Sequence, residues 1–103
     1  MQITFQPKSY REVACDLLAY PVFEDEPKKS TSLERLNKTT RGAVQALLAS
    51  GEFKPELHKT CRVYRPAGLK ARCLLLVGAG KKAQFEPAIF REVVGAAVRH
   101  ARS

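Results

Sequence analysis

Apolar residues recur with the two-residue period of β-strands, or in short continuous runs, over four stretches of the chain. These stretches are residues 2–6, 14–23, 60–65 and 71–77. The second and the fourth are almost entirely apolar, which is typical of strands covered on both faces in α/β sheets. In the third, Cys61 and Val63 are expected on one face, and Arg62 and Tyr64 on the other. Pro21 cannot donate to a strand ladder, so we expect it near a strand end or opposite no neighbour.

Two short helices are predicted between the second and third strands. Hydroxyl side chains at residues 30–32 offer N-cap oxygens to a helix over residues 32–38. Thr39 or Thr40 is expected to cap the next helix. Gly51 follows that helix where a glycine in the left-handed conformation would end it. The apolar face of this second helix has the spacing i, i+3, i+4 and comprises Val44, Leu47 and Leu48.

A longer helix follows the fourth strand. Pro87 suits its first position, because the N–H that proline lacks would have no helical partner there. Its predicted apolar face comprises Phe90, Val93, Val94, Ala97, Val98 and Ala101, and its opposite face Arg91, Gly95, Arg99 and Arg102. The element order is therefore strand, strand, two helices, strand, strand, helix. This order indicates a single α/β layered domain over residues 1–103.

Charge is distributed unevenly along the chain. The formal net charge is +8, and residues 1–53 carry equal numbers of acidic and basic side chains, so the excess lies in residues 54–103. One predicted strand pair with its turn carries a candidate basic surface for single-stranded nucleic acid. Its members are Lys59, Arg62, Tyr64, Arg65, Lys70 and Arg72. Because only one aromatic side chain interleaves these charges, a solvated face or a surface matched to an acidic partner is preferred.

A glycine-rich loop after the fourth strand is a second candidate site. Gly78, Gly80, Lys81 and Lys82 follow a strand and precede a helix, as phosphate-binding loops do. The Walker pattern fails, because Leu75 stands where its first glycine would be and Lys82 replaces the magnesium-binding Ser or Thr. A dinucleotide pattern needs an acidic residue about 20 positions on, at the end of a further strand, and the sequence offers none. A tight turn with two solvated lysines is therefore favoured.

Catalytic and metal-binding groups are sparse. Cys15, Cys61 and Cys73 are an odd number without regular spacing, which indicates reduced thiols. His58 and Cys61 have the spacing of half a zinc site without a second half, so an inert thiol and a loop histidine are favoured. No catalytic residue, metal ligand or cofactor is assigned. Without an apolar run of ~20 residues or a secretory signal, we expect a cytoplasmic protein that does not enter membranes.

Three segments taken together resemble the N-terminal domain of the leucyl (cytosol) aminopeptidase family. They are residues 16–25 (DLLAYPVFED), 42–54 (GAVQALLASGEFK) and 74–85 (LLLVGAGKKAQF). Arg91 and the small residues at 95–97 also fit. The resemblance implies a three-layer α/β fold related to the macro domain, with a mixed sheet flanked by helices. In that family the domain precedes a catalytic domain that holds two divalent metals, zinc or manganese, and the enzyme is a hexamer that releases N-terminal residues from peptides.

The same resemblance sets expectations for function and partners. The family's catalytic lysine, metal ligands and Asn-Thr-Asp-Ala-Glu-Gly-Arg motif all lie in the second domain, so this chain is expected to be non-catalytic and to act through assembly or regulation. The family's domain continues into a further strand after its last helix, so a sheet edge or helix face is expected to be bare. Expected partners are copies of the chain or an aminopeptidase catalytic domain.

Two alternatives stay open at this point. One is a small basic module that binds nucleic acid through the candidate basic surface. The other is a macro-like pocket for a nucleotide or ADP-ribose, with the loop over residues 78–82 at its rim.

Overall fold

The structure, a computed structural model, describes residues 2–5, 11–25 and 31–102, which form four strands and three α-helices. In chain order they are β1 (Ile3–Phe5), β2 (Leu17–Val22), α1 (Thr31–Thr39), α2 (Ala43–Ser50), β3 (Thr60–Tyr64), β4 (Cys73–Gly78), the short 3-10 helix η1 (Lys82–Gln84) and α3 (Pro87–Arg102). The predicted order of elements is confirmed, and Pro87 begins α3 as expected. β2 is shorter than the stretch 14–23, and β4 lies two residues later at its start than the stretch 71–77.

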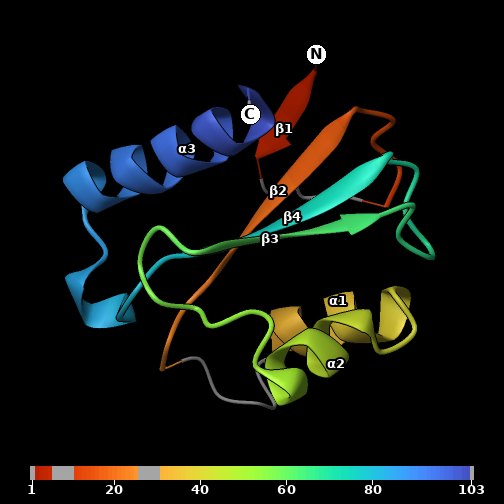
Figure 1. Ribbon diagram of the computed structural model, residues 1–103, viewed down its shortest axis with the longest axis horizontal. Helices are drawn as coiled ribbons and strands as arrows, with labels where there is room; N and C mark the ends of the chain where they lie inside the picture. Colours follow the sequence, from red (N-terminus) through yellow and green to blue (C-terminus); the bar gives the residue numbers. More distant parts are fainter. Residues whose placement is uncertain (1, 6–10, 26–30, 103) are drawn as a thin grey trace.

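The four strands form one mixed sheet in the order β1-β2-β4-β3 (Figure 1). β1, β2 and β4 are parallel, and β3 pairs antiparallel with β4. β2 and β4 pair along their full length, from Leu17 opposite Cys73 to Val22 opposite Gly78. They occupy the centre of the sheet and are almost wholly buried, as their continuous apolar runs predicted.

Pro21 lies at the fifth of the six positions of β2. The N–H of Leu17 donates toward β1, to the carbonyl of Gln2, and strand alternation directs the nitrogen of Pro21 to the same side. The pairing of β1 with β2 ends at Ala19, two residues earlier. The proline therefore costs no hydrogen bond between these described strands, which agrees with the expectation that it would face no neighbour.

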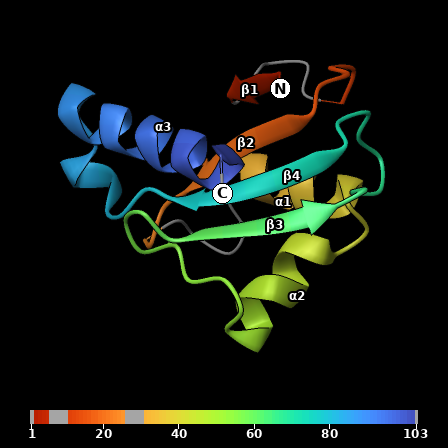
Figure 2. The same cartoon turned by 45° about the horizontal axis from the view of Figure 1, so that its top comes forward.

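The helices cover the two faces of the sheet separately, with α3 on one face and α1 and α2 on the other (Figures 1 and 2). Strand side chains alternate between two apolar clusters. The cluster under α1 and α2 includes Leu18, Tyr20, Val22, Leu36, Val44, Phe53, Leu74 and Leu76. The cluster under α3 includes Leu17, Ala19, Leu75, Val77, Val93 and Ala97. Cys61 and Val63 pack against the first cluster, so β3 has the orientation that its alternation predicted.

The start of α2 differs from the prediction. Its N-cap is Gly42, with a φ of 86° and no side-chain hydrogen bond, and not Thr39 or Thr40. The hydroxyl of Thr40 instead donates to the carbonyl of Leu36 at 2.9 Å, within the last turn of α1. The first turn of α2 is capped from the preceding helix, because the N–H of Gln45 donates to Asn37 Oδ1 at 2.9 Å. Gly51 ends α2 in the left-handed conformation, as predicted.

The buried face of α3 is also rotated from the predicted one. Phe90 was expected inside but is 43% exposed, whereas Val93, Ala96 and Ala97 are buried against the sheet. The small side chains at 96 and 97 thus lie in the apolar cluster between α3 and the sheet. Phe90 lies at the margin and packs edge-on against Phe5, with ring centroids 5.4 Å apart.

Candidate functional site

Backbone hydrogen bonds fix the glycine loop at the carboxyl end of β4. Three consecutive N–H groups each donate to a carbonyl: Gly78 to Lys59 at 2.7 Å, Ala79 to Val22 at 2.9 Å and Gly80 to Pro55 at 3.3 Å. A phosphate-binding loop directs such N–H groups at its ligand. Because these donors already have protein acceptors, the loop geometry favours a structural turn over a phosphate cradle.

The two glycines are required by the backbone around them. A side chain at Gly78 would overlap the carbonyl oxygen of Glu56, which belongs to the segment before β3. Gly80 has a φ of 71°, in the left-handed region that other residues rarely adopt. The glycines therefore allow two chain segments to approach each other closely.

The two loop lysines are exposed and lie beside acidic residues. The N–H of Lys82 donates to Asp25 Oδ1 at 3.1 Å, so a carboxylate occupies the start of η1. The neighbouring Glu24 is held there by its own N–H, which donates to the carbonyl of Gly80 at 2.8 Å. Carboxylates at this position repel a phosphate and partly offset the charges of Lys81 and Lys82.

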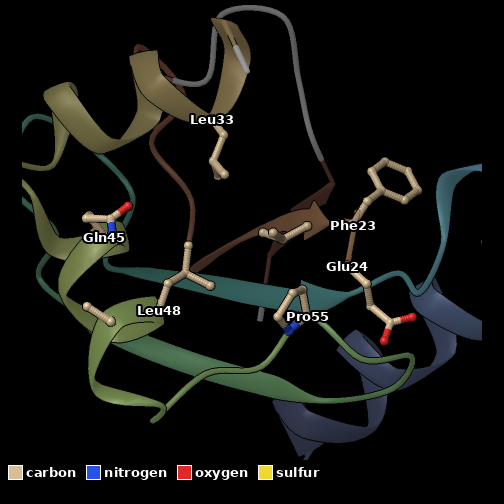
Figure 3. A pocket seen from close by; sticks show the side chains of 8 residues that line it. Phe23, Glu24, Leu33, Gln45, Leu48 and Pro55 are labelled. Carbon is tan, nitrogen blue, oxygen red and sulfur yellow. The ribbon is translucent and has the colours of Figure 1, made fainter. Parts of the chain in front are cut away.

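A cavity of about 250 Å³ lies beside the loop, at the carboxyl end of β2 (Figure 3). It is lined by Val22, Phe23, Glu24, Leu33, Gln45, Leu48, Ala49 and Pro55. Leu33 and Leu48 point into it from α1 and α2. Ligands of open α/β sheets bind at this edge, which makes the cavity a candidate small-molecule pocket. Its largely apolar lining and the acidic Glu24 favour an uncharged or cationic ligand over a phosphate.

Sequence reasoning did not identify this cavity. Its lining residues come from β2, both short helices and the segment before β3, so no local motif contains them. The one available signal was the switch from a buried strand to an acidic segment at Glu24 and Asp25, because such strand ends border ligand sites in α/β sheets.

The structure brings three members of the candidate basic surface together. Arg62 and Tyr64 extend from β3 on the sheet face that carries α3, and Arg62 Cζ lies 5.5 Å from the centroid of the Tyr64 ring. Arg62 and Arg72 line a hollow of about 300 Å³. The other lining residues are Asp16, Leu17 and Cys73, from the starts of β2 and β4. We call this feature, together with Tyr64, the arginine hollow.

The remaining members of the basic surface lie at different distances from the arginine hollow. Arg65 is exposed in the turn after β3, with a φ of 49°, and its N–H donates to the carbonyl of Arg72 at 2.8 Å, so its backbone adjoins the hollow. Lys70 Nζ forms an exposed ion pair with Glu12 Oε2 at 3.1 Å. Lys59 precedes the opposite end of β3, where its carbonyl accepts the N–H of Gly78. Lys59 is therefore separated from the other candidates by the length of β3.

Arg62 changes the electrostatics at the last turn of α3. Burial, and secondly the charge of Arg62, lower the pKa of His100 below its ordinary value of 6.5. The ring nitrogen Nδ1 of His100 lies 3.2 Å from Thr60 Oγ1. His100 is therefore mostly neutral at pH 7 and adds little positive charge beside Arg62.

The described residues contain no group of three or more His, Cys, Asp and Glu side chains that would hold a metal ion. His58 Nε2 lies 3.7 Å from Glu92 Oε1, whereas Cys61 packs into the core under α1 and α2. Burial, with a smaller effect from Glu52, raises the pKa of the Cys61 thiol. The family resemblance places the two divalent metals in the catalytic domain and not in this one. None of the helices in the described part of the chain is long and apolar enough to cross a membrane.

Comparison with known proteins identifies relatives over most of the chain. A family model described as the N-terminal domain of the cytosol aminopeptidase family matches residues 19–103. A probable cytosol aminopeptidase of Acidobacterium capsulatum is 51% identical over 61 residues, which cover 59% of this chain and 12% of the relative. Similarly named proteins of Sulfurihydrogenibium sp. and Solibacter usitatus are 31% and 33% identical, over 99% and 96% of this chain and 20% and 18% of theirs. The chain thus spans at most about a fifth of these relatives.

The glycine loop can be tested by substitution. Gly78→Ala should lower the free energy of unfolding by about 1–3 kcal/mol, because the added methyl group must displace the backbone at Glu56. Urea denaturation followed by circular dichroism measures the change. Lys81→Ala, which changes an exposed residue of the same loop, should leave the urea midpoint of unfolding almost unchanged. A Gly78→Ala variant as stable as the parent would contradict the structural role of the loop.

The lowered pKa of His100 predicts how stability depends on pH. Between the folded pKa and 6.5, the unfolded chain binds more protons than the folded chain. The free energy of unfolding should therefore fall as pH falls below 6.5 toward the folded pKa. His100→Asn should remove this part of the decline in urea titrations at several pH values, while His58→Asn, which deletes the other imidazole, should retain it. An unchanged decline in His100→Asn would reject the assignment.

Proposed function

Because the chain belongs to the cytosol aminopeptidase family, as its N-terminal domain, we propose that it is a non-catalytic domain that acts by assembly. Its partners on this proposal are an aminopeptidase catalytic domain or further copies of the chain. The match of residues 19–103 to that one domain carries the proposal. The zinc or manganese chemistry then belongs to the catalytic domain, and the relatives' name, cytosol aminopeptidase, supports a cytoplasmic location.

The free edge of β3 supports the assembly role. Backbone bonds at both ends of the β3–β4 pair, from Gly78 to Lys59 and from Arg65 to Arg72, fix which residues face β4. Strand alternation then directs the N–H and carbonyl groups of Thr60, Arg62 and Tyr64 away from β4. No described strand pairs with this edge. Such an edge pairs readily with a strand of another chain or domain.

The cavity beside Glu24 supports a second candidate function, a small-ligand module related to macro domains. Helices on both faces of a mixed sheet, with a cavity at the carboxyl end of the central strands, are consistent with that relationship. The bonded amides of the glycine loop and the carboxylates at Glu24 and Asp25 weigh against a phosphorylated ligand. This candidate is therefore confined to ligands without phosphate groups.

Assembly can be measured directly on the chain. Size-exclusion chromatography with light scattering should give masses above the 11.5 kDa monomer that rise with concentration. Thr60→Pro removes an N–H from the free edge of β3 and should weaken the association, whereas Thr60→Ser keeps both that N–H and the side-chain hydroxyl and should not. A clean monomer at every concentration would contradict self-association.

An activity assay on the same purified chain distinguishes a non-catalytic domain from an enzyme. Assayed with a leucine chromogenic substrate and manganese, it should show no turnover. Metal-dependent hydrolysis by the purified chain would overturn the proposed function.

Thermal unfolding tests the second candidate. Adenosine should raise the melting temperature more than ADP-ribose or ATP does, because the Glu24 carboxylate at the cavity repels phosphates. Ala49→Leu, which narrows the cavity, should abolish the stabilisation by adenosine. Greater stabilisation by ADP-ribose or ATP would instead favour a phosphate-binding pocket, and no stabilisation by any of the three would remove this candidate.

A further inference from the structure

The arginine hollow lies where α3 no longer covers the sheet. The carboxyl end of α3 lies over the middle of the sheet, and the ends of the strands where β4 begins extend past it (Figures 1 and 2). Arg62 and Arg72 line the hollow there, and Tyr64, next to Arg62 on the same face of β3, is 70% exposed. An exposed tyrosine beside two arginines is the residue composition enriched at the centres of protein interfaces.

The arginines of the hollow have no acidic partner among the described residues. Neither Arg62 nor Arg72 takes part in an ion pair there, and Arg62 Nε is buried without a hydrogen-bond acceptor. Asp16 lines the same hollow, but its Oδ2 accepts the N–H of Gln2 at 2.8 Å. A buried donor without an acceptor is unfavourable, and two guanidinium groups share the hollow with one carboxylate, so the hollow can take a further group that accepts hydrogen bonds and carries negative charge.

The chemistry of the missing group follows from the two guanidinium groups. Each offers a planar fork of N–H donors that matches the two oxygens of a carboxylate. The Tyr64 ring provides an apolar wall against which the stem of an acidic side chain can pack. From this charge complementarity, we propose that the arginine hollow docks a carboxylate-bearing segment of a partner protein. The proposal rests on the assembly function above and specifies the chemistry of its partner.

The arrangement of charge favours an acidic protein segment over a nucleic acid. The exposed side chains of Lys81 and Lys82 lie beyond the opposite end of β4. That end is about 20 Å from the arginine hollow. The carboxylate of Asp25 lies beside those lysines, where it accepts the N–H of Lys82, and Lys70 is paired with Glu12. A bound single strand needs a continuous basic groove with several stacking aromatic rings. Tyr64 is the one aromatic side chain of the arginine hollow, and the length of β4 separates the hollow from Lys81 and Lys82.

Binding of defined probes to the 103-residue chain tests the docking site. The probes are a blocked hexaglutamate peptide, the matching hexaglutamine peptide and a short oligothymidylate, each titrated by calorimetry at physiological salt. Hexaglutamate should bind and hexaglutamine should not. Arg72→Gln should weaken hexaglutamate binding about ten-fold through the loss of a charged hydrogen bond. Arg62→Lys keeps the charge but loses the fork, and it should also weaken binding.

Arg35→Gln is the matched control, because it removes the same charge from an exposed position on α1, across the sheet. It should change the affinity less than two-fold, as roughly expected for a distant, screened surface charge. Thermal unfolding checks that each variant folds. Absence of hexaglutamate binding, equal weakening by Arg35→Gln, or tighter oligothymidylate binding through Arg62 and Arg72 would each overturn the proposal. If hexaglutamate binds through these arginines while the chain hydrolyses the leucine substrate, the proposed function fails and the docking site stands.

Discussion

The parallel pairing of β2 with β4 is the constraint on which the rest of the structure depends. Leu18, Leu74, Leu75 and Leu76 are completely buried, so neither face of this pair tolerates water. A parallel sheet of this kind must be covered by helices on both faces. α3 meets that requirement on one side, and α1 with α2 meet it on the other. The two ends of the same strand pair are then the places where side chains reach solvent.

Those two ends differ in chemistry because different segments of the chain lie against them. At the carboxyl end, the segments around Glu24, Pro55 and Gly80 bond to one another through their backbones, which uses the local donors and leaves an apolar cavity with an acidic rim. At the amino end, Arg62 and Arg72 line one hollow, and neither takes part in an ion pair among the described residues. The first end is suited to a small ligand without phosphate, and the second to a charged macromolecular partner.

The sequence predicted the elements well because most of them depend on local patterns. The continuous apolar runs identified β2 and β4, and the alternation in β3 correctly placed Val63 and Arg62 on opposite faces. The cap of α2 could not be predicted in this way, because Asn37 belongs to the preceding helix and reaches Gln45 only after the two helices pack. The exposed Phe90 was missed for a similar reason, since the helical period alone does not show which stripe of α3 packs against the sheet.

The candidate site, like the elements, has features set by local sequence patterns and features set only by packing. This also decides what the net charge of +8 means. Strand alternation was sufficient to group Arg62 with Tyr64, but only the register of β3 against β4 brings Arg72 beside them. Glu12 partly offsets the charge of the exposed Lys70, and the length of β4 separates Lys81 and Lys82 from the arginine hollow. An excess of basic residues in the second half of the sequence thus becomes separate patches in space. A nucleic-acid strand binds along a continuous basic track, whereas a docking protein can bind at a local hollow, and this separation of charge is the argument for the proposed protein partner.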